Sequence, residues 1–172
     1  LANRLLNAPA PQPEAHSPRI AHGADVAVIG LSGRFPGAEN AQEFWSMLAE
    51  SRAGTGPLPV GRWSEYLADP VMSEKIAQQN TDGGYIEDIA SFDAEFFGLS
   101  PLEAANMDPQ QRILLELVWE ALEDAGVPAN ELRGTQTGVY MGSTNNDYGM
   151  LIAADSAEMH PYALTGISSA VV

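Results

Sequence analysis

The sequence predicts an α/β fold with a buried sheet, and three observations support that prediction. Hydrophobic residues make up 45% of the 172 positions, enough for the core of about one domain. The expected elements follow the order strand, helix, helix pair, strand, helix, which is typical of α/β architecture. No internal repeat is apparent, so a solenoid or a propeller is not indicated.

Residues 1–24 differ in composition from the rest of the chain. The run "LANRLL" at residues 1–6 has the character of a closing helical turn, and the following stretch is rich in proline and alanine. Such composition predicts a semi-rigid interdomain linker. We expect globular sequence from Asp25 onward. Because the sequence starts at Leu1 rather than at a methionine, we also expect the chain to be part of a longer protein.

A buried strand is predicted over residues 26–29, leaving the sheet through a glycine-rich turn. Gly30, Gly33 and Gly37 do not have the G-x-G-x-x-G spacing of a dinucleotide site. No lysine follows, as a P-loop would require, and the G-L-S-G run is one residue short of a hydrolase elbow. We therefore interpret the turn as structural, and a nucleotide-binding protein is disfavoured.

An amphipathic helix is predicted between Asn40 and Gly54. Asn40 can cap its first turn, and Glu43 completes a capping box. Its apolar face carries Phe44, Met47 and Leu48. Residues 54–91 are interrupted by glycine and proline, which predicts a long excursion with one short helix at "SEKIAQQN".

The clearest helix signals occur between residues 99 and 132. Two helices each begin with an N-cap, a first-turn proline and a capping-box residue, at Ser100, Pro101 and Glu103 and at Asp108, Pro109 and Gln111. The second helix has an apolar stripe made of Ile113, Leu114, Leu117, Val118, Ala121 and Leu122. Gly126 follows as its C′ residue.

A second strand is predicted over residues 139–141, and another helix from Pro161. Parallel strands are buried on both faces, and these two strands need partners on both sides. We therefore expect residues 25–172 to fold poorly when expressed alone, because an open sheet would expose a large apolar face.

The charge balance excludes several classes of partner. The net charge is −15 and the pI about 4.3, which argues against nucleic acid and anionic membrane surfaces. The chain has no cysteine, so disulfides and thiolate metal sites are excluded. No apolar run approaches the length of a membrane span. We expect a cytoplasmic protein without a membrane span.

The residues alone do not form a complete set of catalytic side chains. His16, His22 and His160 lack the spacing of a metal site. Four acids of the long helix could act as general acids or bases or could be a solvated face: Glu116, Glu120, Glu123 and Asp124. Arg112 could pair with a carboxylate or be solvated. Trp45, Met107 and Trp119 are interpreted as core residues.

Several motifs together resemble the amino-terminal half of a β-ketoacyl synthase domain of a modular type I polyketide synthase. They are "VAVIGLSGRFPGAENAQEFWSML", "GGYIEDIASFDAEFFGLSPLEAANMDPQQRILLELVWEALEDAGV", "TGVYMGSTNNDYGML" and "YALTG". The resemblance extends over nearly all of residues 25–172. One departure is Gly33, where such domains usually carry a cysteine that is not the nucleophile.

The resemblance implies the first half of a thiolase-like fold with αβαβα layers, normally dimeric. It implies decarboxylative Claisen condensation of a carrier-bound acyl chain with a malonyl-type extender, using a cysteine and two histidines. The implied partners are an acyl carrier domain, the remainder of the ketosynthase, an adjoining acyltransferase domain and a second copy of the chain. Phosphopantetheine would be carried by the acyl carrier domain, and no cofactor is expected in this segment.

None of the family's catalytic residues lies in this chain, so catalytic, cofactor-binding and metal residues are each predicted as none, and the fragment is expected to be inactive alone. The resemblance places Asn145, Tyr162 and Thr165 near the acyl channel. "LANRLL" is similar to the closing helix of an upstream carrier domain. The alternative to a piece of an enzyme is a non-catalytic ketosynthase-like fragment that serves as an interaction or docking platform.

Overall fold

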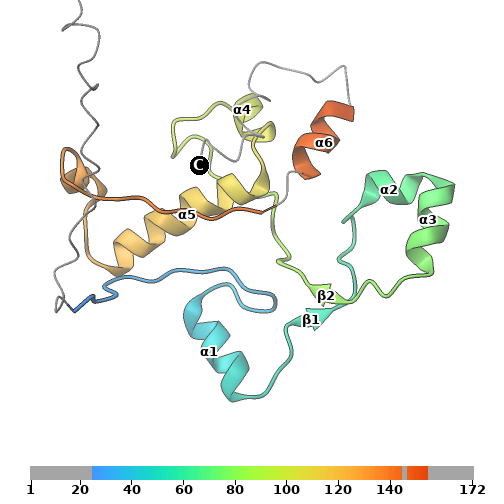
Figure 1. Ribbon diagram of the computed structural model, residues 1–172, viewed down its shortest axis with the longest axis horizontal. Helices are drawn as coiled ribbons and strands as arrows, with labels where there is room; N and C mark the ends of the chain where they lie inside the picture. The colour runs from blue at the N-terminus through green and yellow to red at the C-terminus, as the bar shows by residue number, and fades with distance from the viewer. Residues whose placement is uncertain (1–24, 145–146, 155–172) are drawn as a thin grey trace, which may run out of the picture.

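The computed structural model describes residues 25–144 and 147–154 (Figure 1). The elements in these residues are α1 (Ala41–Ala49), β1 (Thr55–Gly56), α2 (Ser64–Ala68), α3 (Pro70–Ala77), β2 (Gly83–Gly84), α4 (Pro101–Ala105), α5 (Pro109–Asp124), the 3-10 helix η2 (Ala129–Leu132) and α6 (Asp147–Ala154). Helix α5 has 16 residues, and the segment from residue 25 to α1 lies beside it in Figure 1.

The helices begin where their capping residues predict. The Asn40 side chain accepts a hydrogen bond from the Glu43 backbone N–H at 2.9 Å, at the start of α1. The Asp108 carboxylate accepts one from the Gln110 N–H at 2.8 Å, at the start of α5. Ser100 caps α4 in the same way. These bonds satisfy N–H groups that have no partner within the helix.

The two longer predicted helices end differently. Helix α5 ends as predicted, with Gly126 at φ +64° and its N–H donating to the Glu123 carbonyl at 2.9 Å. Helix α1 ends earlier than predicted, because Ser51 rather than Gly54 adopts the left-handed conformation, at φ +55°. The predicted C-terminal glycine of α1 is therefore wrong by three positions.

The excursion after α1 contains more structure than predicted. Strands β1 and β2 pair antiparallel, with Thr55 opposite Gly84 and Gly56 opposite Gly83. Helix α3 overlaps the predicted short helix over residues 73–77: it begins earlier, capped by the Asp69 carboxylate, and ends at Ala77, three residues before the predicted end. Helix α2 contacts α3, so the excursion forms a small helical unit of its own.

A tight turn brings the first segment onto α1. The Phe35 and Ala38 backbones exchange hydrogen bonds of 2.8 and 3.0 Å around a Pro-Gly pair. Gly37 has φ +77°, which suits the third position of a type II turn. The Phe35 ring stacks on Phe44 with centroids 4.1 Å apart, and Ala38 and Met47 are both buried.

The structure does not show the two predicted strands. Residues 26–29 and 139–141 belong to no strand, and Val26, Val28 and Tyr140 are almost fully exposed. A strand is defined by a hydrogen-bonded neighbour, and neither segment has such a neighbour among the described residues. The prediction that Val26–Ile29 is a buried strand is therefore wrong for the structure of this chain.

Two of the predicted core residues are also not in a core. Trp45 is 71% exposed on α1, and Trp119 is 37% exposed on α5. Met107 is half-buried. No helix of the described residues is long and apolar enough to cross a membrane.

Candidate functional site

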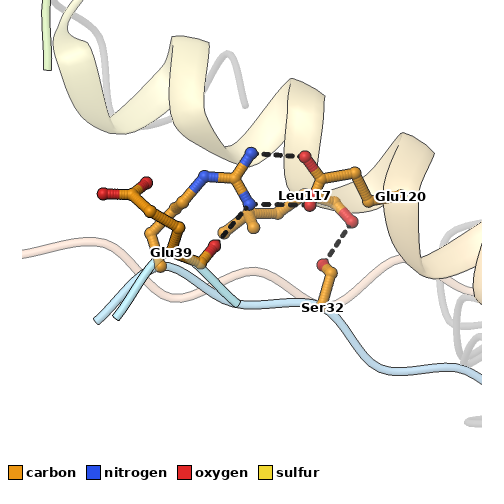
Figure 2. Close-up of polar contacts among 5 residues, drawn as sticks. Ser32, Glu39, Leu117 and Glu120 are labelled. Atoms are coloured by element: carbon orange, nitrogen blue, oxygen red, sulfur yellow. Dashed lines mark hydrogen bonds and ion pairs between the residues drawn. The ribbon is translucent and has the colours of Figure 1, made fainter. Parts of the chain in front are cut away.

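The best-defined polar cluster joins the segment around Arg34 to the middle of α5. Arg34 Nη1 donates to Glu120 Oε2 at 2.7 Å, and Arg34 Nη2 donates to the other carboxylate oxygen, so the pair is bidentate. Arg34 Nη1 also donates to the Glu39 carbonyl at 3.2 Å. Figure 2 shows the carboxylate of Glu120 facing the first segment across this cluster. A bidentate pair fixes both distance and orientation.

Three further contacts extend this cluster along one side of α5. Ser32 Oγ donates to the Leu117 carbonyl at 2.6 Å, as Figure 2 shows. The Leu31 N–H donates to Asp124 Oδ2 at 2.9 Å. A Cβ placed on Gly30 would lie 2.2 Å from the Ala121 carbonyl oxygen, so only glycine allows this approach. The glycine-rich turn therefore serves close packing against a helix, and we call these contacts, with the Arg34 pair, the attachment cluster.

The contacts shift the ionisation of the groups involved. The hydrogen bond from Arg34 lowers the pKa of Glu120, and the same bond raises the pKa of Arg34. Burial raises the pKa of Glu116, one turn earlier on α5, against the opposing effect of Arg34. Neighbouring carboxyl groups of one helix thus differ in proton affinity, because only Glu120 has a guanidinium bound to it.

The α5 acids hold other groups in place, which resolves the alternatives left by the sequence. Glu120 binds Arg34, Asp124 accepts from a backbone N–H, and Glu123 accepts from Trp119 Nε1 at 2.9 Å. Three of the four acids therefore act as hydrogen-bond acceptors for specific groups, which favours neither a merely solvated face nor an acid-base pair. Arg112 was expected either to pair with a carboxylate or to be solvated. Instead, its Nη1 donates to the Ala90 carbonyl at 3.0 Å.

The arrangement positions the chain, and it contains no thiol nucleophile. Cysteine is absent from the sequence, and in residues 25–144 and 147–154 no group of three or more histidine, aspartate or glutamate side chains could hold a metal ion. The predicted channel residues Asn145, Tyr162 and Thr165 lie outside the described residues, as do the three histidines. Their roles, like the linker over 1–24, stay predictions.

Sequence reasoning missed Arg34 and Ser32. A usable signal existed, because Glu116, Glu120 and Asp124 follow at intervals of four residues and share one face of the helix. Such a row in a chain with eight lysines and arginines indicates that one of these cations is bound to it.

Comparison with known proteins connects this geometry to a family. The family model "Beta-ketoacyl synthase, N-terminal domain" matches residues 24–172. The chain is 44% identical over 152 residues to a phenolphthiocerol/phthiocerol polyketide synthase of Mycobacterium tuberculosis, covering 86% of this chain and 10% of that protein. It is also 44% identical over 133 residues to 6-methylsalicylic acid synthase of Aspergillus terreus, covering 76% of this chain and 7% of that protein.

Solved structures agree with these relatives. The module 6 ketosynthase of the bacillaene synthase of Bacillus subtilis matches with a TM-score of 0.65 and 35% identity, over 82% of this chain and 24% of that one. The oxazolomycin ketosynthase domain of Streptomyces albus matches with a TM-score of 0.67 and 30% identity, over 86% of this chain and 27% of that one. These matches confirm the predicted α/β, thiolase-like fold class for a partial domain.

Proposed function

Because the chain belongs to the β-ketoacyl synthase family, as its amino-terminal domain, we propose that it is the first part of a polyketide synthase ketosynthase that performs decarboxylative Claisen condensation. The observation that carries the proposal is the family match over residues 24–172, together with relatives that are polyketide synthases. The chain spans 10% of the length of the first of these relatives, so the activity belongs to the larger protein.

In the proposed reaction a cysteine thiolate outside these 172 residues attacks a carrier-bound acyl thioester, and the carrier thiol leaves. A malonyl-type extender then loses carbon dioxide, and the resulting carbanion attacks the acyl-enzyme. A carbon–carbon bond forms and the cysteine thiolate is released. The chain contains no cysteine, so it cannot form this acyl-enzyme by itself.

Within that enzyme, we assign the described part of the chain a positioning role. The contacts of Leu31, Ser32 and Arg34 hold residues 30–34 against α5, so this part of the first segment has a fixed relation to the helix. Asn145, Tyr162 and Thr165 are proposed to line the acyl channel. The proposed partners are a phosphopantetheine-bearing acyl carrier domain, an adjoining acyltransferase domain and a second copy of the chain, in the cytoplasm.

The test compares the isolated chain with the complete ketosynthase polypeptide that contains it. Each is incubated with an acyl-loaded and a malonyl-loaded carrier, and acyl-enzyme and β-ketoacyl product are measured by mass spectrometry. We expect product only from the complete protein, and loss of the acyl-enzyme when its nucleophilic cysteine is replaced by alanine. Absence of product from the complete, folded protein would favour the non-catalytic docking platform instead.

The channel assignment has a separate test in the complete protein. Asn145→Trp and Tyr162→Ala are compared for acylation by short and long acyl donors. We expect the ratio of the two acylation rates to change while the dimer stays intact, because the variants alter the shape of the channel. Equal losses with all donors would show that these residues do not line it.

A further inference from the structure

An exposed aromatic surface lies where residues 96–97 meet α5, next to the attachment cluster. The Phe96 and Trp119 rings meet edge to face with centroids 4.8 Å apart, and Phe96 meets Phe97 in the same way at 5.0 Å. Phe96 is nevertheless 53% exposed and Trp119 37% exposed. These rings line a hollow of about 370 Å³ together with Glu116 and Glu123.

A second, larger hollow continues this surface toward the end of α5. It has a volume of about 740 Å³, and its lining includes the apolar Leu122 and Val127 and the cationic Arg133. Trp119 and Glu123 line both hollows, so the two form one band. We call this band the aromatic groove.

The charge of the groove selects a cationic occupant. Four carboxylates and one guanidinium line its first hollow, which leaves a net charge of −3 there, and Arg133 of the second hollow brings the whole groove to −2. The guanidinium of the first hollow is that of Arg34, which is already bound by Glu120. Glu116 and Glu123 stand beside the aromatic rings, and within the described part of the chain neither of them forms an ion pair. An arginine would satisfy both features, since its guanidinium pairs with carboxylates and stacks on aromatic faces.

The chain itself contains a segment of this chemistry. Residues 9–24, "PAPQPEAHSPRIAHGA", hold four prolines and Arg19. Residues 1–24 carry two arginines and one glutamate, a net +1, against −16 for the remaining residues. Proline-rich segments favour an extended conformation that aromatic-lined grooves bind at low entropic cost. The family match starts at residue 24, so residues 9–23 of this segment lie outside it.

The segment is long enough to reach the groove. Leu31 is bound to Asp124, and Trp119 lies five residues earlier on the same helix, about 7.5 Å along its axis. The 12 residues that separate Arg19 from Leu31 can span up to about 40 Å when extended. The length of chain between Arg19 and Leu31 is therefore sufficient for Arg19 to contact the aromatic groove.

We propose that residues 9–24 dock into the aromatic groove, with the prolines against Phe96 and Trp119 and Arg19 between Glu116 and Glu123. The linker would then fix the direction in which an upstream domain leaves the ketosynthase. This interaction does not depend on the condensation chemistry, so its test is independent of the proposed activity.

Limited trypsin digestion of the complete ketosynthase polypeptide tests the docking. Trypsin cuts after Arg4, outside the proposed contact, and after Arg19, inside it. We expect the Arg19–Ile20 bond to be cut about tenfold more slowly than in a synthetic peptide of residues 1–24, because cleavage follows the population of the undocked segment. The Arg4–Leu5 bond lies outside the proposed contact, so variants in the groove should not change its rate of cleavage.

Variants in the groove identify the contact. Trp119→Ala should abolish the protection at Arg19, whereas Trp45→Ala, on an exposed tryptophan of α1, should leave it unchanged. If Trp119→Ala fails to fold, Glu123→Lys tests the same contact at an exposed position. This variant should also abolish the protection of the Arg19–Ile20 bond. Equal cleavage at Arg19 in protein and peptide, or protection that survives these groove variants, would overturn the proposal.

Discussion

Replacing Glu120 by glutamine tests whether the bidentate pair with Arg34 fastens the first segment to α5. Hydrogen bonds to charged groups contribute about 1.5–3 kcal/mol where water is excluded. The two side chains are 23% and 36% exposed, so screening reduces this contribution. We expect Glu120→Gln to lower the free energy of unfolding of the complete ketosynthase by about 1–2 kcal/mol.

The assay is urea unfolding, in which the variants should keep the m-value of the wild type, and Glu50→Gln is the matched control. Glu50 pairs with Arg52 through a single contact, and these side chains are 62% and 53% exposed. The control should cost less than about 0.5 kcal/mol. A double-mutant cycle with Arg34→Met should show coupling between the two partners. Equal losses for Glu120→Gln and Glu50→Gln, or no coupling, would refute the reasoning.

The same pair predicts a pH dependence with a definite sign. The bond to Arg34 lowers the folded-state pKa of Glu120, so its stabilisation is complete above the pKa of the unfolded carboxyl group. It is lost as the pH falls through the lower folded-state value. The difference in stability between the wild type and Glu120→Gln should therefore shrink in acid.

Three further substitutions follow from the structure. Gly30→Ala would place a methyl group 2.2 Å from the Ala121 carbonyl oxygen and should cost about 1–3 kcal/mol in urea unfolding, whereas Gly56→Ala meets no atom within 4 Å and should be tolerated. Asp108→Ala removes the N-cap of α5 and should cost about 1 kcal/mol in the same assay; no loss would contradict the capping argument. Glu116→Gln should be at least as stable as the wild type at pH 7, because burial raises the pKa of the carboxyl group it replaces, and an unfolding series should show that advantage vanish below about pH 4.

The parts of the fold that the sequence predicts are those set by neighbouring residues. Asn40 and Asp108 cap their helices as predicted because each accepts from an N–H two or three residues later. The strands over 26–29 and 139–141 depend on partners elsewhere, and apolar β-branched runs do not say which partner is present. The exposed Trp45 shows the same limit, because residue type alone does not decide burial.

The attachment cluster was beyond local reasoning for a different reason. Arg34 and Glu120 are separated by 86 residues, and no local pattern in the sequence indicates that these two side chains meet. A row of acids on one helix face was visible, but its interpretation as an acid-base or solvated face was incomplete. The channel residues Asn145, Tyr162 and Thr165 depended on resemblance to a family, and their assignment still rests on it.

The contact between Leu31 and Asp124 has a consequence for synthesis on the ribosome. The two residues are 93 positions apart, so the first segment leaves the ribosome long before the helix that receives it. At about 5–20 residues per second this interval is roughly 5–20 s. During that time Leu31, Ser32 and Arg34 lack their partners on α5. The exposed apolar side chains of Val26, Val28 and Ile29 then make the nascent chain vulnerable to aggregation and a candidate for chaperone binding. Slow translation between residues 31 and 124 would lengthen this exposure without changing a single contact of the finished fold.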